Sequence, residues 1–291
     1  MQEISPLLDS TKVRSNAFDW SWRPDSFESF IQEFEHIAGS ISNPDRLILY
    51  RGQRDCVWPI DSTIARSLKK HWLQIPADEK LNHRARESID LHRLLVSAVL
   101  WKFLGVIGPS EELLGHETRI PELDSMFELM KRLQQYPEKE PDWIALPGTP
   151  LVDWSESKEI GLFFANWNRA HERPGAVYVF DATESGKVLQ TLKVSEILAK
   201  LAKTINERSP GLPPLFSPPK QILTTRAKRQ KACYFAHMDM RYDLAQIWRL
   251  QERALGRRIL LKLVLPAKTN DLISRHLEEK GLTEGFVIVE E

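Results

Sequence analysis

Residues 149–167 have the sequence Thr-Pro-Leu-Val-Asp-Trp-Ser-Glu-Ser-Lys-Glu-Ile-Gly-Leu-Phe-Phe-Ala-Asn-Trp. Leu151 and Val152 suit a short buried strand. Apolar residues then recur at three- and four-residue steps, which places them on one face of a helix. The segment therefore predicts a strand, a tight polar turn and a buried helix in immediate succession. The residues on the apolar face are Ile160, Phe163, Phe164 and Trp167.

The turn between this strand and helix is rich in small polar side chains. Asp153, Ser155 and Ser157 can each accept a hydrogen bond from an unpaired amide at the start of the helix. A turn that aims polar side chains and helix amides at one point can bind an anion or a polar ligand. The alternative is a well-capped core helix without a ligand.

A second segment combines an apolar strand with residues suited to ligand binding. Residues 47–53, Leu-Ile-Leu-Tyr-Arg-Gly-Gln, predict a buried strand that ends in Arg51, Gly52 and Gln53. Glycine lets a ligand approach the backbone, and the guanidinium offers a planar fork to phosphate or carboxylate. Alternatively, Arg51 pairs with a carboxylate in the core and Gly52 only turns the chain.

The densest positive cluster of the chain precedes a further apolar strand at residues 232–236. An anionic ligand is one reason for such a cluster, and solvated surface charge is the commoner reason. The cluster consists of Arg226, Lys228, Arg229 and Lys231.

The composition indicates a soluble globular protein. The 291 residues include 40 basic and 40 acidic residues, so no overall field draws the molecule to nucleic acid or to an acidic membrane. The 42% hydrophobic and 27% charged residues are typical of a globular rather than a disordered protein. The length allows one large domain or two smaller ones, and we expect one domain with an insertion. The N-terminal sequence has neither a basic start nor a long apolar run, so the default expectation is a cytoplasmic protein without membrane association.

The two cysteines, Cys56 and Cys233, do not form a metal-binding motif. There is no Cys-x-x-Cys pair and no helical pair of histidines to complete a site, so we expect no metal. Both are expected to be free thiols in a reducing compartment, and their positions in two motif segments allow them to be neighbours in space.

The rest of the chain predicts the domain organisation. Residues 1–25 form a lead-in that lays aromatic residues on the domain surface, and residues 26–291 form the domain. A helical insertion at about 78–136, with helices over 78–104 and 121–135, separates the two motif strands. The other expected helices lie over 26–38, after Ser62, over 186–206 and from Thr269 to Gly281. Strands are expected over 176–180 and 283–289, an edge or near-edge strand closed by proline over 258–266, and a proline-rich loop or lid over 209–219.

Several short motifs occur in a characteristic order. They are Tyr50-Arg51-Gly52-Gln53, Trp58-Pro59 with residues 62–66, Leu151-Val152-Asp153-Trp154 with residues 162–165, Arg226 with Gln230 and Phe235, and a strand to Pro266 followed by a helix. In this order and combination the chain resembles the FRG domain family, which is named after an aromatic-Arg-Gly motif at the position of residues 50–52. The resemblance spans about residues 26–287. The family carries a His and a Thr-Arg pair before its Leu-Leu-Asp-Trp core, whereas this chain has Ile144 and Thr149-Pro150, which implies weakened or altered chemistry.

The same layout is similar to that of ADP-ribosyltransferases of the arginine-serine-glutamate type. This resemblance implies an α+β fold with a split, mixed or antiparallel sheet, in which Arg51 grips NAD and Ser155 and Ser157 shape the nicotinamide pocket. The late-strand glutamate of that family, which stabilises positive charge on the ribose, has Gln230 as its nearest counterpart here. A neutral amide lacks the charge for that role, so the source of the carboxylate stays open among Glu156, Glu159 and Glu252.

We therefore expect a bacterial FRG-type protein whose pocket binds a phosphate-bearing, nucleotide-like ligand such as NAD. It would act as a transferase or NAD-consuming enzyme, as a toxin or in stress or phage defence, with Arg51, Asp153 and Gln230 at the reacting centre. The alternative is a non-catalytic module that senses a nucleotide or a protein partner through the same pocket. A third hypothesis, nucleic-acid binding through residues 226–231, is disfavoured by the neutral net charge. The other expected ligand contacts are Tyr50, Gly52, Gln53, Arg66, Trp154, Ser155, Ser157, Phe164 and Arg226.

Overall fold

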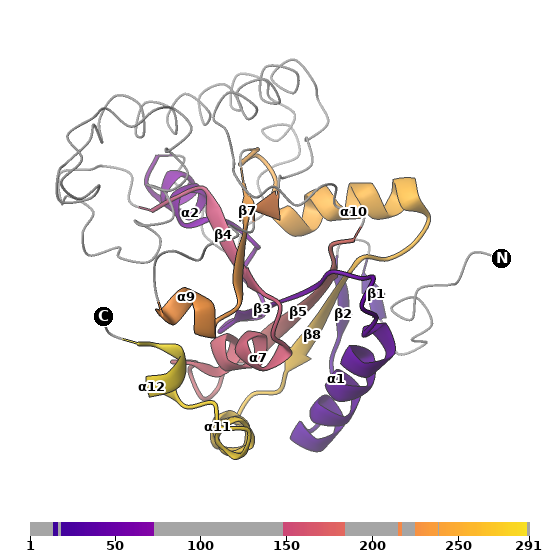
Figure 1. Ribbon diagram of the computed structural model, residues 1–291. Coiled ribbons are helices and arrows are strands. Elements are labelled where there is room, and N and C mark those ends of the chain that lie inside the picture. The colour runs from indigo at the N-terminus through magenta and orange to yellow at the C-terminus, as the bar shows by residue number, and fades with distance from the viewer. Residues whose placement is uncertain are drawn as a thin grey trace.

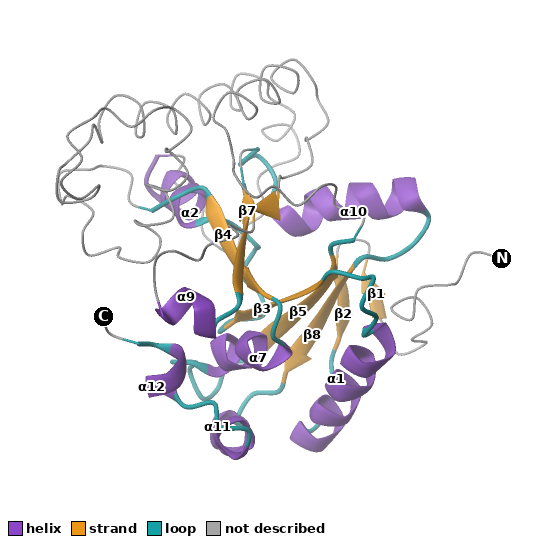
Figure 2. Ribbon diagram, in the orientation of Figure 1, coloured by secondary structure: helices purple, strands orange, loops and turns teal. Residues whose placement is uncertain are grey.

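The computed structural model describes residues 14–16, 19–72, 148–183, 215–216, 225–237 and 239–289. Their strands form one mixed sheet with helices on both faces, which confirms the α+β class (Figures 1 and 2). The expected insertion at about 78–136, the helix over 186–206 and Ile144 lie outside the described residues.

The sheet has the strand order β1-β2-β8-β5-β3-β4-β7-β6. Strand β2 runs parallel to β8, and every other neighbouring pair is antiparallel. The central strands β5 and β8 are buried along their whole length, which explains their nearly continuous apolar sequences. The strands are β1 (Arg14–Asn16), β2 (Asp19–Trp22), β3 (Ile48–Gln53), β4 (Leu151–Ser155), β5 (Gly175–Asp181), β6 (Leu215–Phe216), β7 (Ala232–Ala236) and β8 (Leu260–Leu265).

The sheet divides between β3 and β4. One residue pair joins these strands, Tyr50 opposite Ser155, whereas β3 pairs with β5 over six positions and β4 pairs with β7 over five. Beyond this pair the strands separate, so β3, β5 and β8 form one half of the sheet and β4 and β7 form the other (Figure 1). The division therefore has a joined end at Tyr50 and Ser155, and an open end at Gln53 and Leu151.

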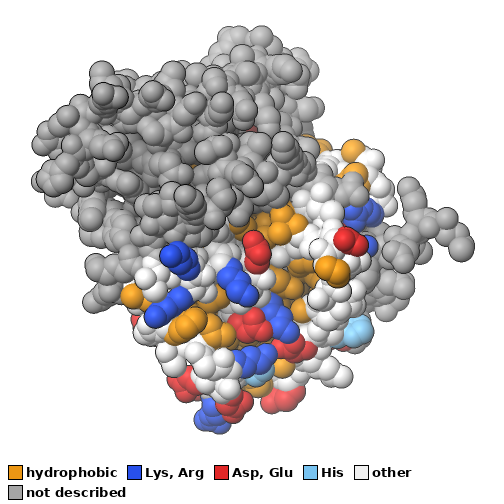
Figure 3. Space-filling model, in the orientation of Figure 1, with side chains coloured by type: hydrophobic (Ala, Val, Ile, Leu, Met, Phe, Trp, Pro, Cys, Tyr) orange, Lys and Arg blue, Asp and Glu red, His pale blue; other side chains and the backbone are white. Residues whose placement is uncertain are grey.

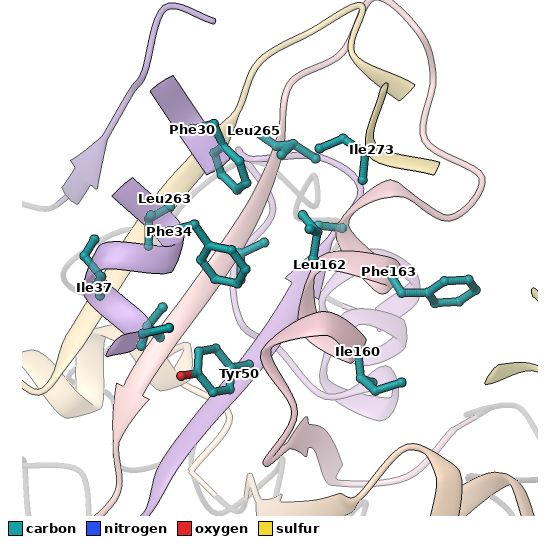
Figure 4. Packing of buried hydrophobic residues seen from close by; sticks show 14 of the residues in the cluster. Phe30, Phe34, Ile37, Tyr50, Ile160, Leu162, Phe163, Leu263, Leu265 and Ile273 are labelled. Carbon is teal, nitrogen blue, oxygen red and sulfur yellow. The ribbon is translucent and has the colours of Figure 1, made fainter. Parts of the chain in front are cut away.

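Helices cover both faces of the sheet (Figure 1). On one face α1 (Phe27–Ile41), α7 (Lys158–Asn166) and α11 (Asn270–Glu279) enclose a hydrophobic cluster, in which Phe34 of α1 lies edge-on to Tyr50 (Figure 4). On the other face Trp248 of α10 (Leu244–Leu255) packs on Phe180, with 4.2 Å between ring centroids. The shorter helices are α2 (Thr63–Ser67), which continues as the π-helical turn η1 (Leu68–Trp72), α9 (Thr225–Arg229) and α12 (Glu284–Val287).

The helix starts follow the local sequence. Ser26, Ser62 and Ser157 cap α1, α2 and α7, and each side chain accepts a hydrogen bond from the amide three residues later. The strands over 47–53 and 176–180 are confirmed within one residue, and the helix after Ser157 is confirmed as well, whereas the strand that begins at Leu151 is longer than expected and includes Asp153 and Ser155. At the C-terminal end of α11, Gly281 has φ of 76°, a left-handed conformation that suits glycine.

Three expectations are wrong. Residues 19–22 are not a surface lead-in, because they form β2 and Trp22 is buried in the core. Strand β8, expected at or near an edge, pairs on both sides, with β2 and β5. Residues 283–289 contain the short helix α12 instead of a strand, because the Thr283 hydroxyl caps it by accepting a hydrogen bond from the Phe286 amide at 3.3 Å.

Candidate functional site

A cavity of about 480 Å³ lies at the division between β3 and β4. It is lined by β3 and the segment after it, by α2, by β4 and the following helix α7, and by α9 and β7. Arg51, Asp153 and Gln230, which are far apart in the sequence, all face it. The other lining residues are Tyr50, Gly52, Gln53, Arg54, Trp58, Pro59, Arg66, Trp154, Ser155, Ile160, Gly161, Phe164, Trp167, Arg226, Ala232 and Tyr234.

Arg51 spans the two halves of the sheet. It extends from β3, and its Nη1 donates to the main-chain carbonyl of Asp153 on β4 at 2.5 Å. Burial lowers the pKa of Arg51 to about 10, although the nearby Asp153 acts to raise it, so the group is a cation at neutral pH. Its Nε has no hydrogen-bond partner among the described residues. A desolvated cation held by a carbonyl, not by a carboxylate, is suited to receiving an anion.

Three further guanidinium groups line the same cavity. Arg66 donates to the Asp61 carbonyl at 2.7 Å and to the Thr63 hydroxyl at 3.2 Å. Arg54 lies over the ring of Trp58, 5.4 Å from its centroid. The third, Arg226, projects from α9.

The charges of the cavity do not balance. Its lining has four guanidinium groups and one carboxylate among the described residues, which leaves an excess of three positive charges. None of the four arginines forms an ion pair with a described carboxylate. Burial lowers the pKa of Arg66, although the charges of Asp61 and Asp153 act to raise it, and the neighbouring Arg54 adds to the lowering. The cavity therefore favours an anionic ligand.

Gln230 and Ser155 face the cavity but hold its wall together. The Gln230 amide Nε2 donates to the Val287 carbonyl at 3.0 Å, which ties α12 to α9. The Ser155 hydroxyl donates to the Gln230 carbonyl at 2.6 Å and accepts a hydrogen bond from the Ser157 amide at 2.9 Å. A ligand that contacts the Gln230 amide must therefore compete with its hydrogen bond to the Val287 carbonyl.

Three other expected site residues make capping or packing contacts within the fold. Ser157 is not part of the lining, because it caps α7 and donates to Glu159 at 2.9 Å. A Cβ added at Gly52 would lie 2.2 Å from the Gly161 carbonyl oxygen of α7, so the backbone that approaches this glycine most closely is that of a helix. The Tyr50 ring is buried against α1, and burial raises the pKa of Tyr50 to about 12.

The three glutamates considered for the missing carboxylate do not line the cavity. Glu156 is exposed, and Glu159 interacts with the cap of α7. The Glu252 carboxylate accepts hydrogen bonds from the amides of Ile259 and Leu260, at 2.8 and 2.9 Å, near the opposite face of the sheet. Asp153, which is exposed, is the carboxylate that the described lining offers.

Several lining residues were not among the expected ligand contacts. Arg54 directly follows the Arg-Gly-Gln strand end, Trp58 belongs to the Trp58-Pro59 motif shortly after it, and Trp167 lies on the same helix face as Phe164, as the helical spacing predicts. Tyr234 faces Asp153 across the pairing of β4 and β7, a relation that depends on strand register and is not visible in the sequence.

The basic cluster does not form a single surface. Arg226 lines the cavity, whereas Arg229 lies 4.9 Å from the Phe286 ring centroid and donates to the Phe286 carbonyl at 3.3 Å. Figure 3 shows positive and negative side chains interspersed over the described part of one face. Cys56 and Cys233 are free thiols buried in the same hydrophobic cluster.

The described residues contain no group of three or more His, Cys, Asp or Glu side chains that could hold a metal ion. Within the same part of the chain, none of the helices has the length and apolar character needed to cross a bilayer.

Comparisons of the chain with protein-family models, with curated proteins and with solved structures found no match.

Proposed function

We propose that the cavity between β3 and β4 binds a phosphate-bearing, nucleotide-like ligand, with NAD as the first candidate, and that the chain is an FRG-type protein. The observation that carries this proposal is the convergence of Arg51, Asp153 and Gln230 on one cavity whose lining has an excess of positive charge. The guanidinium groups supply forked donors for phosphate oxygens. A role in bacterial stress or phage defence belongs to the same proposal and rests on the resemblance alone.

The aromatic part of the lining supports a nucleotide rather than a simple anion. Trp58 lies beside Arg54, and Phe164 and Trp167 of α7 pack edge to face with 6.2 Å between centroids. Aromatic faces stack on bases, and the charged groups between them match phosphates.

Catalysis would depend on Asp153. In transfer or hydrolysis of NAD, the bond between the ribose and the nicotinamide nitrogen breaks with its electron pair going to the nitrogen, and positive charge develops on the ribose. A carboxylate close to that centre stabilises the charge. Asp153 is the acidic residue of the described lining, which makes it the candidate for this role.

Binding without catalysis is the second candidate. It is favoured by Gln230, the nearest counterpart of the glutamate of the resembled transferases, because this side chain is a neutral amide that donates to the Val287 carbonyl. In this case the cavity senses a nucleotide and passes the signal to a protein partner.

Calorimetric titration with NAD, ADP-ribose and ATP tests the proposal. We expect saturable binding of a ligand to the wild-type protein. In Arg51→Ala the affinity should fall at least about tenfold, since hydrogen bonds to charged groups typically contribute that much. Arg253→Ala is the matched control, because it removes an exposed guanidinium from α10 on the other face of the sheet. An absence of binding by folded wild-type protein would overturn the proposal.

Product analysis of the NAD sample separates the two candidates. Nicotinamide release that Asp153→Asn abolishes, with ADP-ribose binding retained, supports the enzyme. Binding without release supports the sensing module.

A further inference from the structure

The positive side chains of the cavity come from opposite ends of the division between β3 and β4. Helix α2, which carries Arg66, is attached at the open end, where the Ile64 amide donates to the Thr149 carbonyl at 3.2 Å just before β4. Helix α9, which carries Arg226, is attached at the joined end, where the Ser155 hydroxyl donates to the Gln230 carbonyl at 2.6 Å. Ser155 lies four residue steps after Leu151 along β4, which corresponds to roughly 13 Å.

Arg51 lies between these two ends. Its guanidinium reaches the Asp153 carbonyl, halfway along β4, at 2.5 Å. Besides burial, Arg66 acts to lower the pKa of Arg51 and Arg54 acts to lower the pKa of Arg66, so Arg66 lies within electrostatic range of both. Arg226 lines the cavity from α9, which is attached at the joined end, so it supplies positive charge from the end opposite to Arg66.

A single phosphate can be held by the forks of one or two arginines. It would satisfy Arg51 and Arg66 but leave the charge of Arg226 unmatched. Two phosphates in a row present oxygens toward both ends of the cavity, and their additional negative charge suits the excess of three positive side chains. The presence of Arg226 in the lining is therefore informative about the ligand class.

Resting on the proposed function, we infer that the site selects ligands with a diphosphate group, which bridges from Arg51 and Arg66 to Arg226. Arg226 then determines specificity, since it distinguishes a dinucleotide or nucleoside diphosphate from a nucleoside monophosphate. The bases contribute less to this selection, because the aromatic lining can stack on the base of a diphosphate ligand and on that of a monophosphate alike.

The test compares ADP-ribose and NAD with the two monophosphate halves of NAD, AMP and nicotinamide mononucleotide. Affinities are measured by calorimetry for the wild-type protein and for Arg226→Ala, Arg226→Lys and Lys228→Ala. Lys228 is exposed on the same helix and does not line the cavity, so its variant removes one charge from α9 without touching the site. Thermal unfolding of each variant checks that it is folded.

We expect the diphosphate ligands to bind wild-type protein at least about tenfold more tightly than either half. Arg226→Ala removes most of this preference, with little effect on AMP. Arg226→Lys restores part of it, and Lys228→Ala leaves it unchanged.

Two results would overturn the inference while nucleotide binding stands. One is equal affinity of the wild-type protein for AMP and ADP-ribose. The other is that Arg226→Ala lowers the affinity for AMP and for ADP-ribose by the same factor. If none of the four compounds binds, the proposed function fails together with the inference.

Discussion

Gly52 illustrates how one residue determines the distance between α7 and the sheet. A Cβ at this position would lie 2.2 Å from both the Ala165 amide nitrogen and the Gly161 carbonyl oxygen. These are backbone atoms of a helix, so they cannot move aside as a flexible side chain can. The place of glycine in the motif thus has a packing reason, in addition to any role beside the cavity.

We predict that Gly52→Ala lowers the free energy of unfolding by about 2–3 kcal/mol, the usual cost of overpacking a core. Gly39→Ala is the control, because a Cβ there meets no atom within 4 Å and alanine is the better residue in the exposed part of α1. Urea unfolding measures both. Unchanged stability of Gly52→Ala would show that α7 is not seated as described.

His237 links the end of β7 to α2. Its Nδ1 accepts a hydrogen bond from the Ser62 amide at 3.2 Å, so Nε2 carries the proton and donates to the Tyr242 carbonyl at 2.7 Å. The ring is fully buried, and burial lowers the pKa of His237. The folded protein therefore holds this imidazole neutral, whereas the unfolded chain takes up a proton below about pH 6.5.

We predict that stability falls as the pH drops below about 6.5, because the unfolded state then binds the additional proton. The contribution is fully present above that pH, and the loss from one such group is at most about 1.4 kcal/mol per pH unit. In His237→Gln, an amide can make both hydrogen bonds without titrating, so this part of the slope disappears. An identical slope in urea unfolding between pH 7.5 and 5.5 would contradict the assignment.

At the scale of elements, a helix or strand can be predicted from the sequence when the residues that determine it lie within the segment itself. Helix α1 follows from a cap at Ser26 and apolar residues at helical spacing, and both signals lie within the segment itself. The run Val287-Ile288-Val289 suggested a strand, but the segment forms α12, in which the Thr283 hydroxyl accepts from the Phe286 amide and the distant Gln230 amide donates to the Val287 carbonyl. Contacts across 57 residues are not readable from local composition.

The link between α9 and α12 gives a prediction for Gln230→Glu. A carboxylate cannot donate to the Val287 carbonyl, so we expect a loss of about 1–2 kcal/mol in the free energy of unfolding and no gain in nicotinamide release. Gln246→Glu on α10 is the control for charge, and a change within about 0.5 kcal/mol is expected there. Increased NAD cleavage by Gln230→Glu would instead show that this position serves the reaction directly.

At the scale of the whole molecule, the division of the sheet is the feature that creates the site. Motif order led to the expectation that Arg51, Asp153 and Gln230 share a pocket, and they line one cavity. The sequence could not show that Arg51 contacts the carbonyl of Asp153, because this contact depends on the point where β3 and β4 separate. Nor could it reveal the roles of Trp22 in the core or of Tyr234 in the lining, which follow from strand order.

The most direct test of the central claim is a crystal structure of the protein with ADP-ribose. We predict that the ligand lies between β3 and β4, with a phosphate within hydrogen-bond distance of the Arg51 guanidinium. A ligand bound elsewhere, or a division between the strands filled by protein side chains, would contradict the account.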